Sequence, residues 1–217
     1  MPEGDARAQK IAATMRRRRL NNFRKWRSLH PIYYASLRKS GDLAEFYGTM
    51  LGDGCIEKFP RTEKLSISFN SKEIDHINHI AKLIAKLFKR ESSIRKHKGK
   101  HCVALTLYQK NISSRLKFPT GIKRLYPIRI PFWIRKNGKF LIKCLKGLFE
   151  TDGDWVVDKR YGTNVIKFTN VSQTLLNDVH RSLRGLGFTA HNGHKRVTIS
   201  KKTEVEKIVK MIKFRQY

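Results

Sequence analysis

The chain has 217 residues and carries 47 Lys and Arg against 17 Asp and Glu, a formal net charge of +30 at pH 7. Hydrophobic residues make up 40% of it, enough for a packed core, so the composition excludes a wholly disordered polycation. It has no apolar run of about 18 residues or more, so we expect no membrane-spanning helix and no membrane partner. A folded protein with this charge is expected to bind a polyanion, although composition leaves DNA and RNA equally open.

The cysteine pattern bears on the cellular compartment. Cys55, Cys102 and Cys144 lie far apart and form no C-x-x-C pair, which argues against a disulfide framework and against a cysteine zinc site. The N-terminus lacks the apolar segment that a secretion signal has between its basic run and its cleavage site. We therefore expect an intracellular protein with reduced thiols, in the cytoplasm, the nucleoid or an organelle.

Residues 1–41 form a strongly basic N-terminal arm. They contain eleven Lys and Arg against two acids, including the run Arg16–Arg19. Two interpretations stay open: a solvated tail, or a segment that neutralises phosphates and docks on nucleic acid or on the body of the protein. The second interpretation relies on aromatic residues interleaved with the charge, at Phe23, Trp26, Tyr33 and Tyr34.

From residue 42 onward, one order of elements occurs twice. The first occurrence is a predicted helix that ends at Gly52-Asp53-Gly54, strands over 55–58 and 65–70, a helix over 72–89, and strands over 93–96 and 102–107. The second is a helix from about Phe140 that ends at Thr151-Asp152-Gly153, strands over 155–157 and 164–169, a helix over 174–186, strands over 188–191 and 196–200, and a helix over 203–214. Asp42 and Glu45 form a D-x-x-E pattern, typical of a helix N-terminus, at the start of the first helix.

The spacing of the two landmarks indicates an internal duplication. Asp53 and Asp152 are 99 residues apart, which matches a repeated unit of about 100 residues. We therefore predict an α+β fold of two pseudo-symmetric αββαββα repeats. The expected domain order is the arm (1–41), the first repeat (42–118), a linker rich in Pro and Gly (119–138) and the second repeat (139–217).

Small residues lie on one face of each short helix. They are Gly48 and Gly52 in the first and Gly147 and Thr151 in the second, each pair spaced i and i+4. Helices that present small residues to each other can pack at nearly backbone distance. Such a contact would place Asp53 and Asp152 side by side.

Paired carboxylates at adjoining helix C-termini repel each other and the negative ends of the helix dipoles. A divalent cation reverses this repulsion. Oxygen ligands suit Mg²⁺ or Mn²⁺, and a metal bound there can activate water for phosphodiester hydrolysis. A single Asp-Gly is more simply a turn that ends a helix. Because the pattern occurs twice at matching positions, we favour a metal site.

These residues resemble the paired motifs of the LAGLIDADG homing endonucleases of the single-chain, two-motif type: Phe46–Gly54 is FYGTMLGDG and Leu145–Gly153 is LKGLFETDG. The resemblance implies that the motif helices form the interface of two halves and that antiparallel sheets form a DNA-binding saddle. It also implies that the last acid of each motif binds metal and helps cut one strand. The implied metal ligands are Asp53, Asp152 and the carbonyl groups of Gly52 and Thr151.

The resemblance also implies roles for residues near the motifs. Asn70 and Asn170 end matching strands and would hold metal-bound water, although such an Asn can also bond its own backbone. A basic residue is expected beside the site. Lys123 is the best candidate in the first half, with Lys213 or Arg215 as its rough counterpart, and simple contact with phosphate or solvent is the alternative.

One motif position differs between the repeats, since Leu51 in the first matches Glu150 in the second. In the family this position normally faces away from the metals, so the difference does not argue against activity.

Histidines and aromatics outside the motifs are given simpler roles. The pairs His76 and His79, and His191 and His194, lack a Cys or acid to complete a zinc set, so we expect them to face solvent or DNA. Trp155, Phe168 and Phe188 are expected in the core.

Polar and basic side chains alternate with apolar ones along the predicted strands, as expected for a surface that contacts a DNA groove. The candidate DNA-binding residues are Lys58, Arg61, Lys64, Ser66, Ser68, Arg95, Lys96, Lys159, Arg160, Lys167 and Arg196.

The leading hypothesis is a site-specific, Mg²⁺-dependent endonuclease that cuts both strands of duplex DNA, acts as a monomer and is encoded in a mobile intron. An intein is disfavoured because the chain neither begins with Cys or Ser nor ends in His-Asn. The alternative is a binding protein on the same scaffold, an RNA maturase bound to its host-intron RNA or a DNA-binding regulator. A ribosome-associated basic protein is a third interpretation, and it leaves the duplicated acidic motif unexplained.

Overall fold

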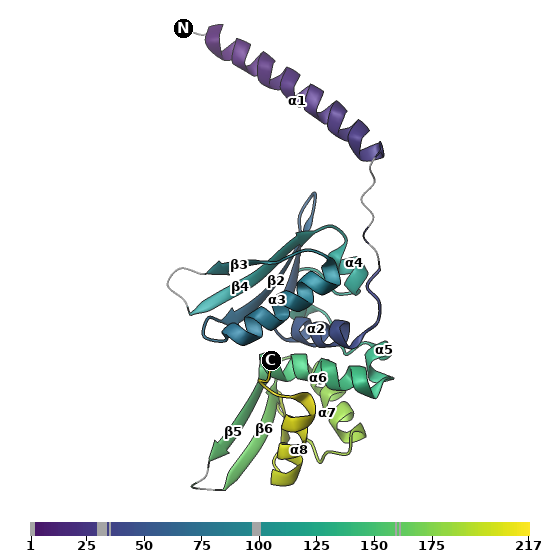
Figure 1. Ribbon diagram of the computed structural model, residues 1–217, viewed down its shortest axis with the longest axis vertical. Helices are drawn as coiled ribbons and strands as arrows, with labels where there is room; N and C mark the ends of the chain where they lie inside the picture. The colour runs from purple at the N-terminus through teal and green to yellow at the C-terminus, as the bar shows by residue number, and fades with distance from the viewer. Residues whose placement is uncertain (1–2, 30–33, 35, 97–100, 159, 161) are drawn as a thin grey trace. The chain divides into compact units, whose positions relative to one another are not determined.

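The computed structural model describes residues 3–29, 34, 36–96, 101–158, 160 and 162–217. The chain separates into two compact units, Met1–Ala35 and Ser36–Tyr217. The first unit contains one long helix, α1 (Glu3–Leu29), which covers most of the basic arm (Figure 1). Its described side chains, those of residues 6–18 and of Leu29, are exposed.

The structure does not test whether the aromatic residues of the arm dock on nucleic acid or on the body of the protein. Tyr33 lies outside the described residues, as do the side chains of Phe23 and Trp26, so docking through these aromatics stays a prediction.

No helix in the described part of the chain combines the length and the apolar character that a membrane span needs.

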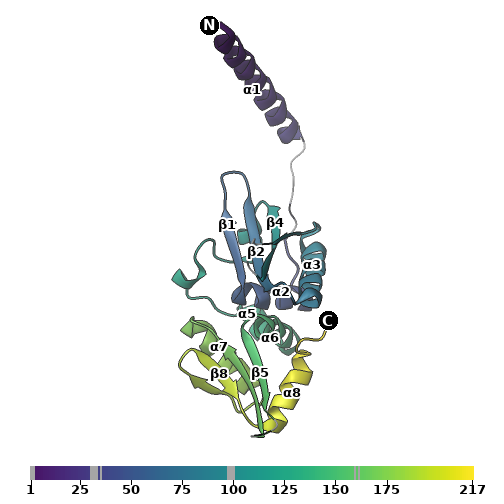
Figure 2. The same ribbon diagram turned by 90° about the vertical axis from the view of Figure 1, so that its left-hand side faces the viewer.

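The second unit consists of two similar halves joined by a short connection (Figures 1 and 2). The first half contains α2 (Gly41–Gly52), β1 (Gly54–Lys58), β2 (Glu63–Asn70), α3 (Ile74–Phe88), β3 (Ser93–Lys96), β4 (Cys102–Gln109) and α4 (Ile112–Leu116). The connection contains η1 (Lys123–Leu125) and α5 (Phe132–Arg135). The second half contains α6 (Gly138–Asp152), β5 (Gly153–Asp158), β6 (Thr163–Thr169), α7 (Gln173–Gly185), β7 (His191–Gly193), β8 (Arg196–Ile199) and α8 (Lys202–Ile212).

Each half has one four-stranded antiparallel sheet, with the orders β1-β2-β4-β3 and β5-β6-β8-β7. Gly54 pairs with Ile67 in the first sheet and Gly153 with Phe168 in the second, so the glycine after each motif aspartate begins the first strand of its sheet. The predicted α+β fold of two pseudo-symmetric repeats is confirmed.

The two faces of each sheet differ as the alternation of residues predicts. In β2, Leu65, Ile67 and Phe69 are buried, while Lys64, Ser66 and Ser68 point to the opposite face. Helices cover the buried face, where the ring of Phe46 in α2 meets that of Phe88 in α3 edge to face at 5.6 Å. The polar face of the sheet remains open.

Some local predictions were wrong. Strand β7 begins at His191 and not at 188, because Phe188 is drawn into the core (2% exposed). Phe168 is also buried, as expected, but Trp155 is 40% exposed. Trp155 lies on β5, an edge strand of the sheet, and its indole N–H donates to Oδ1 of Asn164 on the adjacent strand (2.9 Å). The short helix α4 is the last helix of the first predicted αββαββα repeat, whereas α5 forms in the linker, for which we predicted no helix.

Helices α2 and α6 pack against each other in the middle of the second unit, between the two sheets (Figures 1 and 2). A Cβ atom on Gly48 would lie 2.1 Å from the carbonyl oxygen of Cys144, and one on Gly147 would lie 2.2 Å from that of Glu45. The backbones therefore touch at both glycines. The predicted close approach of the two motif helices is confirmed.

Candidate functional site

The two motif aspartates lie at the same end of the α2–α6 contact. Asp53 follows the last residue of α2, and its N–H donates to the carbonyl of Thr49 (3.0 Å). Asp152 is the last residue of α6. A Cβ on Gly52 would lie 1.9 Å from Oγ1 of Thr151 and 3.3 Å from Oδ2 of Asp152. The small residues before each aspartate thus bring the two chain segments together where α2 and α6 end.

Both carboxyl groups are held in a setting that disfavours their charge. The pKa of Asp53 is raised to about 6, first by loss of hydration in the cleft and then by the negative charge of Asp152. Burial also raises the pKa of Asp152, against the opposing effects of a hydrogen bond from Asn170 and the charge of Lys123. The repulsion expected from the sequence is therefore present between these two groups.

Lys123, in η1, lies against the end of α2. Its Nζ donates to the carbonyl oxygens of Met50 (3.2 Å), Leu51 (2.9 Å) and Gly52. It thereby caps the negative end of the helix dipole. Burial lowers its pKa, while the charges of Asp152 and Asp53 raise it. The basic residue expected beside the first motif does lie there, but it holds helix carbonyls, including the Gly52 carbonyl that was an implied metal ligand.

The two candidate asparagines are used differently. Asn170 donates from Nδ2 to Oδ2 of Asp152 (2.7 Å), and its Oδ1 accepts from the N–H of Ser172 (2.9 Å). Asn70 also accepts from a backbone N–H two residues on, that of Lys72 (3.1 Å), and it lines the same cavity as Asp53. Both side chains thus make the local backbone bond considered as the alternative, and Asn170 in addition orients an aspartate. Their contact with metal-bound water stays a prediction.

A cavity of about 260 Å³ adjoins Asp53. Besides Asn70 it is lined by Glu73 and His76 of the first half and by Glu150, Thr151 and Arg215 of the second. Contrary to the expectation that it faces solvent or DNA, His76 is buried (3% exposed), with its ring edge to face with Phe69 and stacked on Tyr217. Its place on the inner face of α3 explains the burial.

The interpretation of Glu45 as part of a D-x-x-E pattern at the helix N-terminus was wrong. Ser40 caps the N-terminus of α2, accepting from the N–H of Leu43 (3.1 Å), and Glu45 instead lies buried in the α2–α6 interface. Its carboxylate binds Nε2 of His79 (2.6 Å) and Nζ of Lys143 (2.8 Å), with Nζ of Lys146 at 3.5 Å. Burial alone would raise its pKa, but these partners together lower it to about 2. Glu45 therefore joins the two halves by charge.

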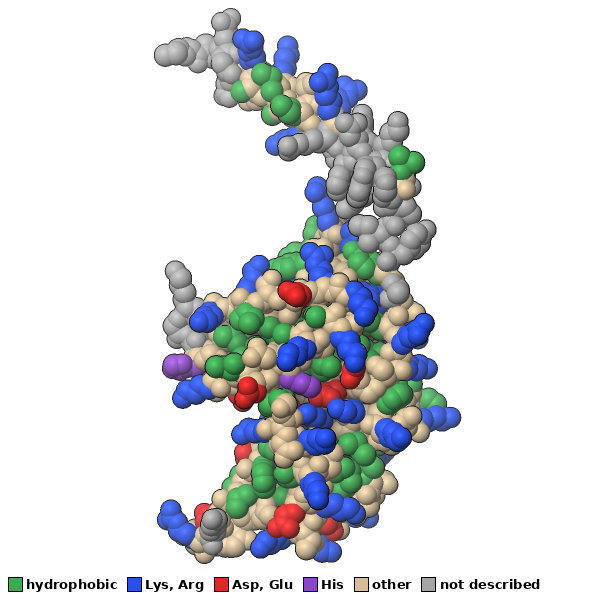
Figure 3. Space-filling model, in the orientation of Figure 1, with side chains coloured by type: hydrophobic (Ala, Val, Ile, Leu, Met, Phe, Trp, Pro, Cys, Tyr) green, Lys and Arg blue, Asp and Glu red, His purple; other side chains and the backbone are tan. Residues whose placement is uncertain are grey.

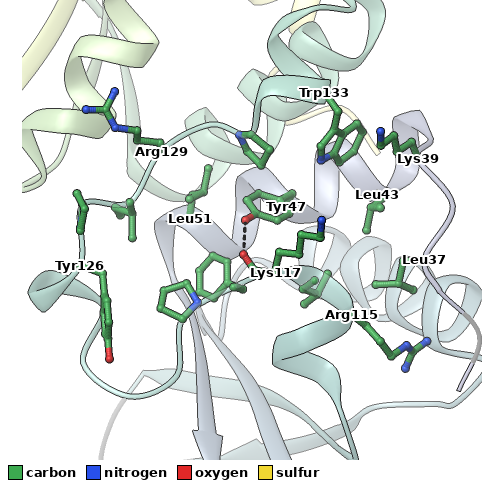
Figure 4. Close-up of a pocket in the computed structure, with 16 residues that line it drawn as sticks. Leu37, Lys39, Leu43, Tyr47, Leu51, Arg115, Lys117, Tyr126, Arg129 and Trp133 are labelled. Atoms are coloured by element: carbon green, nitrogen blue, oxygen red, sulfur yellow. Dashed lines mark hydrogen bonds between the residues drawn. The ribbon is translucent and has the colours of Figure 1, made fainter.

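A second cavity, of about 570 Å³, lies on another side of α2 (Figure 4). Leu43, Tyr47 and Leu51, spaced i, i+4 and i+8, form one wall, and the Tyr47 hydroxyl donates to the carbonyl of Lys117 (3.3 Å). No Asp or Glu is among the described residues that line it. The sixth motif position of α2, Leu51, thus lines this cavity, whereas the matching Glu150 of α6 lines the cavity of Asp53.

The candidate DNA-binding residues are distributed over both sheets. Lys64, Ser66 and Ser68 lie on the open face of β2, Arg95 and Lys96 on β3, Lys167 on β6 and Arg196 on β8, and Lys58 ends β1. Arg61 and Arg160 lie in the connections β1–β2 and β5–β6, and Lys159 lies outside the described residues. Lys64 also pairs with Glu57 (2.9 Å). Figure 3 shows Lys and Arg side chains spread over both halves, with few acidic ones among them. Their contact with DNA stays a prediction.

The residues at the paired motif fit a hard cation. Their donors are oxygens, the carboxylates of Asp53 and Asp152 and the carbonyl of Thr151, and such ligands suit Mg²⁺ or Mn²⁺. The mutual repulsion of the two carboxylates is the observation that a cation would relieve. Within the described residues, no three His, Cys, Asp or Glu side chains come together as a metal cluster. A metal here would therefore rely on two carboxylates, backbone oxygens and water.

Comparison with known proteins identifies the scaffold. Residues 139–217 match the family described as the LAGLIDADG-like domain, and no curated protein matches the sequence. The fold resembles the homing endonuclease I-DmoI. The structure of I-DmoI with DNA and Mn has 24% sequence identity to this chain and a TM-score of 0.53, and the match covers 79% of this chain and 96% of that chain. Its structure with DNA and Ca is 22% identical, with a TM-score of 0.54 over 79% and 88%.

A third similar structure carries a different name. The N-terminal LAGLIDADG domain of DUF199/WhiA is 14% identical, with a TM-score of 0.57 over 84% of this chain and 86% of that chain. Residues 139–217 thus resemble a LAGLIDADG-like domain, and the two halves together have a fold similar to that of the homing endonuclease I-DmoI.

Proposed function

We propose that this protein is a site-specific homing endonuclease that hydrolyses both strands of a long duplex DNA target with Mg²⁺ or Mn²⁺. The observation that carries the proposal is the pairing of Asp53 and Asp152 at the ends of two helices that meet backbone to backbone. Two carboxylates that repel each other destabilise the fold, which is unexpected unless they have a ligand. We further propose that it acts inside the cell as a monomer encoded by a mobile intron.

The residues have separate tasks in this proposal. Asp53 and Asp152 would hold the metal, which supplies an activated water and stabilises the leaving oxygen of the phosphodiester. Asn170 keeps the carboxylate of Asp152 in one orientation through its 2.7 Å hydrogen bond. Lys123 fixes the last turn of α2 and adds positive charge beside the phosphate that is cut. The open sheet faces and the +30 net charge hold the duplex.

The test begins with selection of cleaved sites from a random DNA library in Mg²⁺, which reveals the target sequence directly. On a plasmid that carries this target, wild-type protein should convert supercoiled DNA to the linear form. Asp53→Asn and Asp152→Asn should each lose cleavage of at least one strand and yield nicked or uncut plasmid. Full double-strand cleavage by both variants would reject the assignment.

A binding function without cleavage is the second candidate, and Lys123 is the observation that favours it. An ammonium group that donates to the carbonyl of Gly52 and is attracted by both aspartates can take the place of a metal ion as their counter-charge. The protein would then be a DNA-binding regulator or an RNA maturase. Mg²⁺-independent binding of duplex DNA without cutting would support the regulator. Preference for the folded host-intron RNA would support the maturase.

A further inference from the structure

The segment after α8, Lys213–Tyr217, folds back onto the contact between the two halves. Phe214 is buried (4% exposed), and the next residue, Arg215, has a φ of 52°. A left-handed backbone is uncommon for a residue with a side chain and persists where surrounding contacts hold it. The conformation of Arg215 therefore indicates that contacts with neighbouring residues hold this segment in place.

Two buried charged side chains of α6 hold it. Glu150 accepts a hydrogen bond at Oε1 from the N–H of Arg215 (2.6 Å) and another at Oε2 from the hydroxyl of Tyr217. Lys146, about one helical turn earlier, donates to the carbonyl of Gln216 (3.0 Å). Because Glu150 and Lys146 are 8% and 5% exposed, these bonds are shielded from competition by water.

The same segment reaches the first half through Tyr217. Its ring stacks on that of His76 in α3, with centroids 5.2 Å apart and 13° between the planes, and it lies 5.5 Å from the ring of His79. The ammonium group of Lys146 lies 5.2 Å from the centroid of the Tyr217 ring. One side chain thus contacts α3 of the first half and two residues of α6 in the second.

We propose that Arg215–Tyr217 is a clasp across the interface of the halves and that Tyr217 is a positioning residue for the paired aspartates. The proposal rests on the proposed function of those aspartates. Glu150 lies two residues before Asp152 in the last turn of α6, and His76 lines the cavity of Asp53. By binding Glu150 while it stacks on His76, Tyr217 fixes the separation of the two carboxylates.

The matching positions in the opposite halves indicate that packing alone does not require these residues. Leu51 takes the place of Glu150 in α2 and lines the cavity of about 570 Å³. The residue 99 positions after His76 is Leu175, which is fully buried at the matching place in α7. Of these two matching pairs of positions, the pair that contacts the segment 215–217 is polar (Glu150 and His76), and the other pair is apolar (Leu51 and Leu175).

The first experiment removes a single oxygen atom. Tyr217→Phe keeps the ring on His76 but loses the bond to Glu150. We expect single-turnover cleavage of the strand that depends on Asp152 to slow by about tenfold with target affinity unchanged, because misplacing a reacting group costs rate rather than binding. Tyr126→Phe is the matched control, since the two tyrosines are 47% and 48% exposed. Equal rates for Tyr217→Phe and wild type would overturn the proposal.

A second pair of variants asks whether Tyr217 acts through Glu150. Glu150→Gln keeps a carbonyl oxygen that can accept from the N–H of Arg215, and its NH2 group can donate to the hydroxyl oxygen of Tyr217. It should therefore cleave nearly as fast as wild type. Glu150→Leu copies Leu51 and should slow the same strand as Tyr217→Phe does. Adding Tyr217→Phe to Glu150→Leu should then cause no further loss, since both changes remove one shared interaction. Additive losses would mean that Tyr217 acts by another route, and the proposal would be wrong.

Hydrogen exchange tests the clasp independently of the proposed function. In the full chain without DNA, the backbone amides of residues 148–152 should exchange faster in Tyr217→Phe than in wild type or Tyr126→Phe. If wild-type protein cuts no DNA, the proposed function fails and the clasp is judged by this measurement. Unchanged exchange at the end of α6 would reject the clasp whatever the cleavage result.

Discussion

Gly48 of α2 lies so close to Cys144 of α6 that a Cβ atom on the glycine would be 2.1 Å from the cysteine carbonyl oxygen. The pseudo-symmetric contact, Gly147 against the carbonyl of Glu45, is nearly as short at 2.2 Å. In both cases the obstacle is backbone, which cannot rotate away as a side chain can. The two halves are therefore held at a separation that only glycine permits.

Gly48→Ala and Gly147→Ala should each lower the free energy of unfolding by about 2–4 kcal/mol, because the added methyl group forces the motif helices apart. Urea denaturation followed by circular dichroism measures this. Gly185→Ala is the control, since a Cβ on this helical glycine of α7 meets nothing within 4 Å, and it should change stability by less than about 1 kcal/mol. A Gly48→Ala protein as stable as wild type would contradict the contact.

Glu45→Gln should be far more destabilising than an equal change at the surface. It leaves the ammonium of Lys146, whose side chain is 6% exposed, without its carboxylate partner, and removing one member of a buried pair costs about 3–5 kcal/mol. Glu57→Gln breaks the exposed pair with Lys64 and should cost at most about 1 kcal/mol. Similar unfolding midpoints for the two variants would show that Glu45 does not join the halves.

Two groups at the interface, His76 and Glu45, should each stabilise the protein less as the pH falls, and in different pH ranges. The pKa of His76 is lowered from 6.5 to about 4 by burial and by the nearby charges of His79 and Lys146, against a smaller opposing effect of Glu45. The unfolded chain therefore binds the proton of this histidine first, so the contribution of His76 to stability falls as pH drops from 6.5 to 4. Glu45, with its pKa lowered to about 2, adds a further loss as pH drops below 4.5. His76→Leu should remove the contribution of His76 from a plot of unfolding free energy against pH. An unchanged slope between pH 6.5 and 4 would argue against it.

Asp53→Asn should stabilise the protein above pH 6. Because the pKa of Asp53 is raised to about 6 in the folded state from 3.8, its ionisation opposes folding increasingly as pH rises from about 4 to 6, and the penalty is constant above that range. The melting temperature of Asp53→Asn should thus exceed that of wild type at pH 8 and equal it near pH 3.

Magnesium provides the complementary measurement. Mg²⁺ should raise the melting temperature of wild type at pH 8, because a ligand that binds the folded state alone stabilises it. Removal of the metal with a chelator should reverse the rise. The rise should be small or absent in Asp53→Asn. An equal rise in both proteins would place metal binding elsewhere.

The fold was largely predictable because its signals are local. Alternation in β2, helical spacing in α3 and the repeated landmarks at Asp53 and Asp152 each come from residues close together in the chain. The small faces of α2 and α6 then predicted which helices meet, since only such faces allow backbone contact.

The errors concern residues whose partners are distant in sequence. The D-x-x-E pattern at Asp42 and Glu45 suits a helix cap, but Glu45 finds His79 34 residues away and Lys143 98 residues away. His76 is buried in part by Tyr217, from the other end of the chain. Trp155 looked like a core residue by type, yet its strand lies at a sheet edge. No local pattern contains this information.

The charges around Glu45 also determine which halves can associate. Counting 99 residues along the chain, Cys144 matches Glu45, while Ala44 and Tyr47 match Lys143 and Lys146. Two first halves joined through α2 would bury two Glu45 carboxylates, each still bonded to His79 but with no lysine opposite. Two second halves joined through α6 would bury two Lys146 ammonium groups with no carboxylate opposite. Loss of one member of a buried ion pair costs about 3–5 kcal/mol. The two halves are therefore complementary in charge and not interchangeable, which disfavours a symmetric dimer of either half with its own copy.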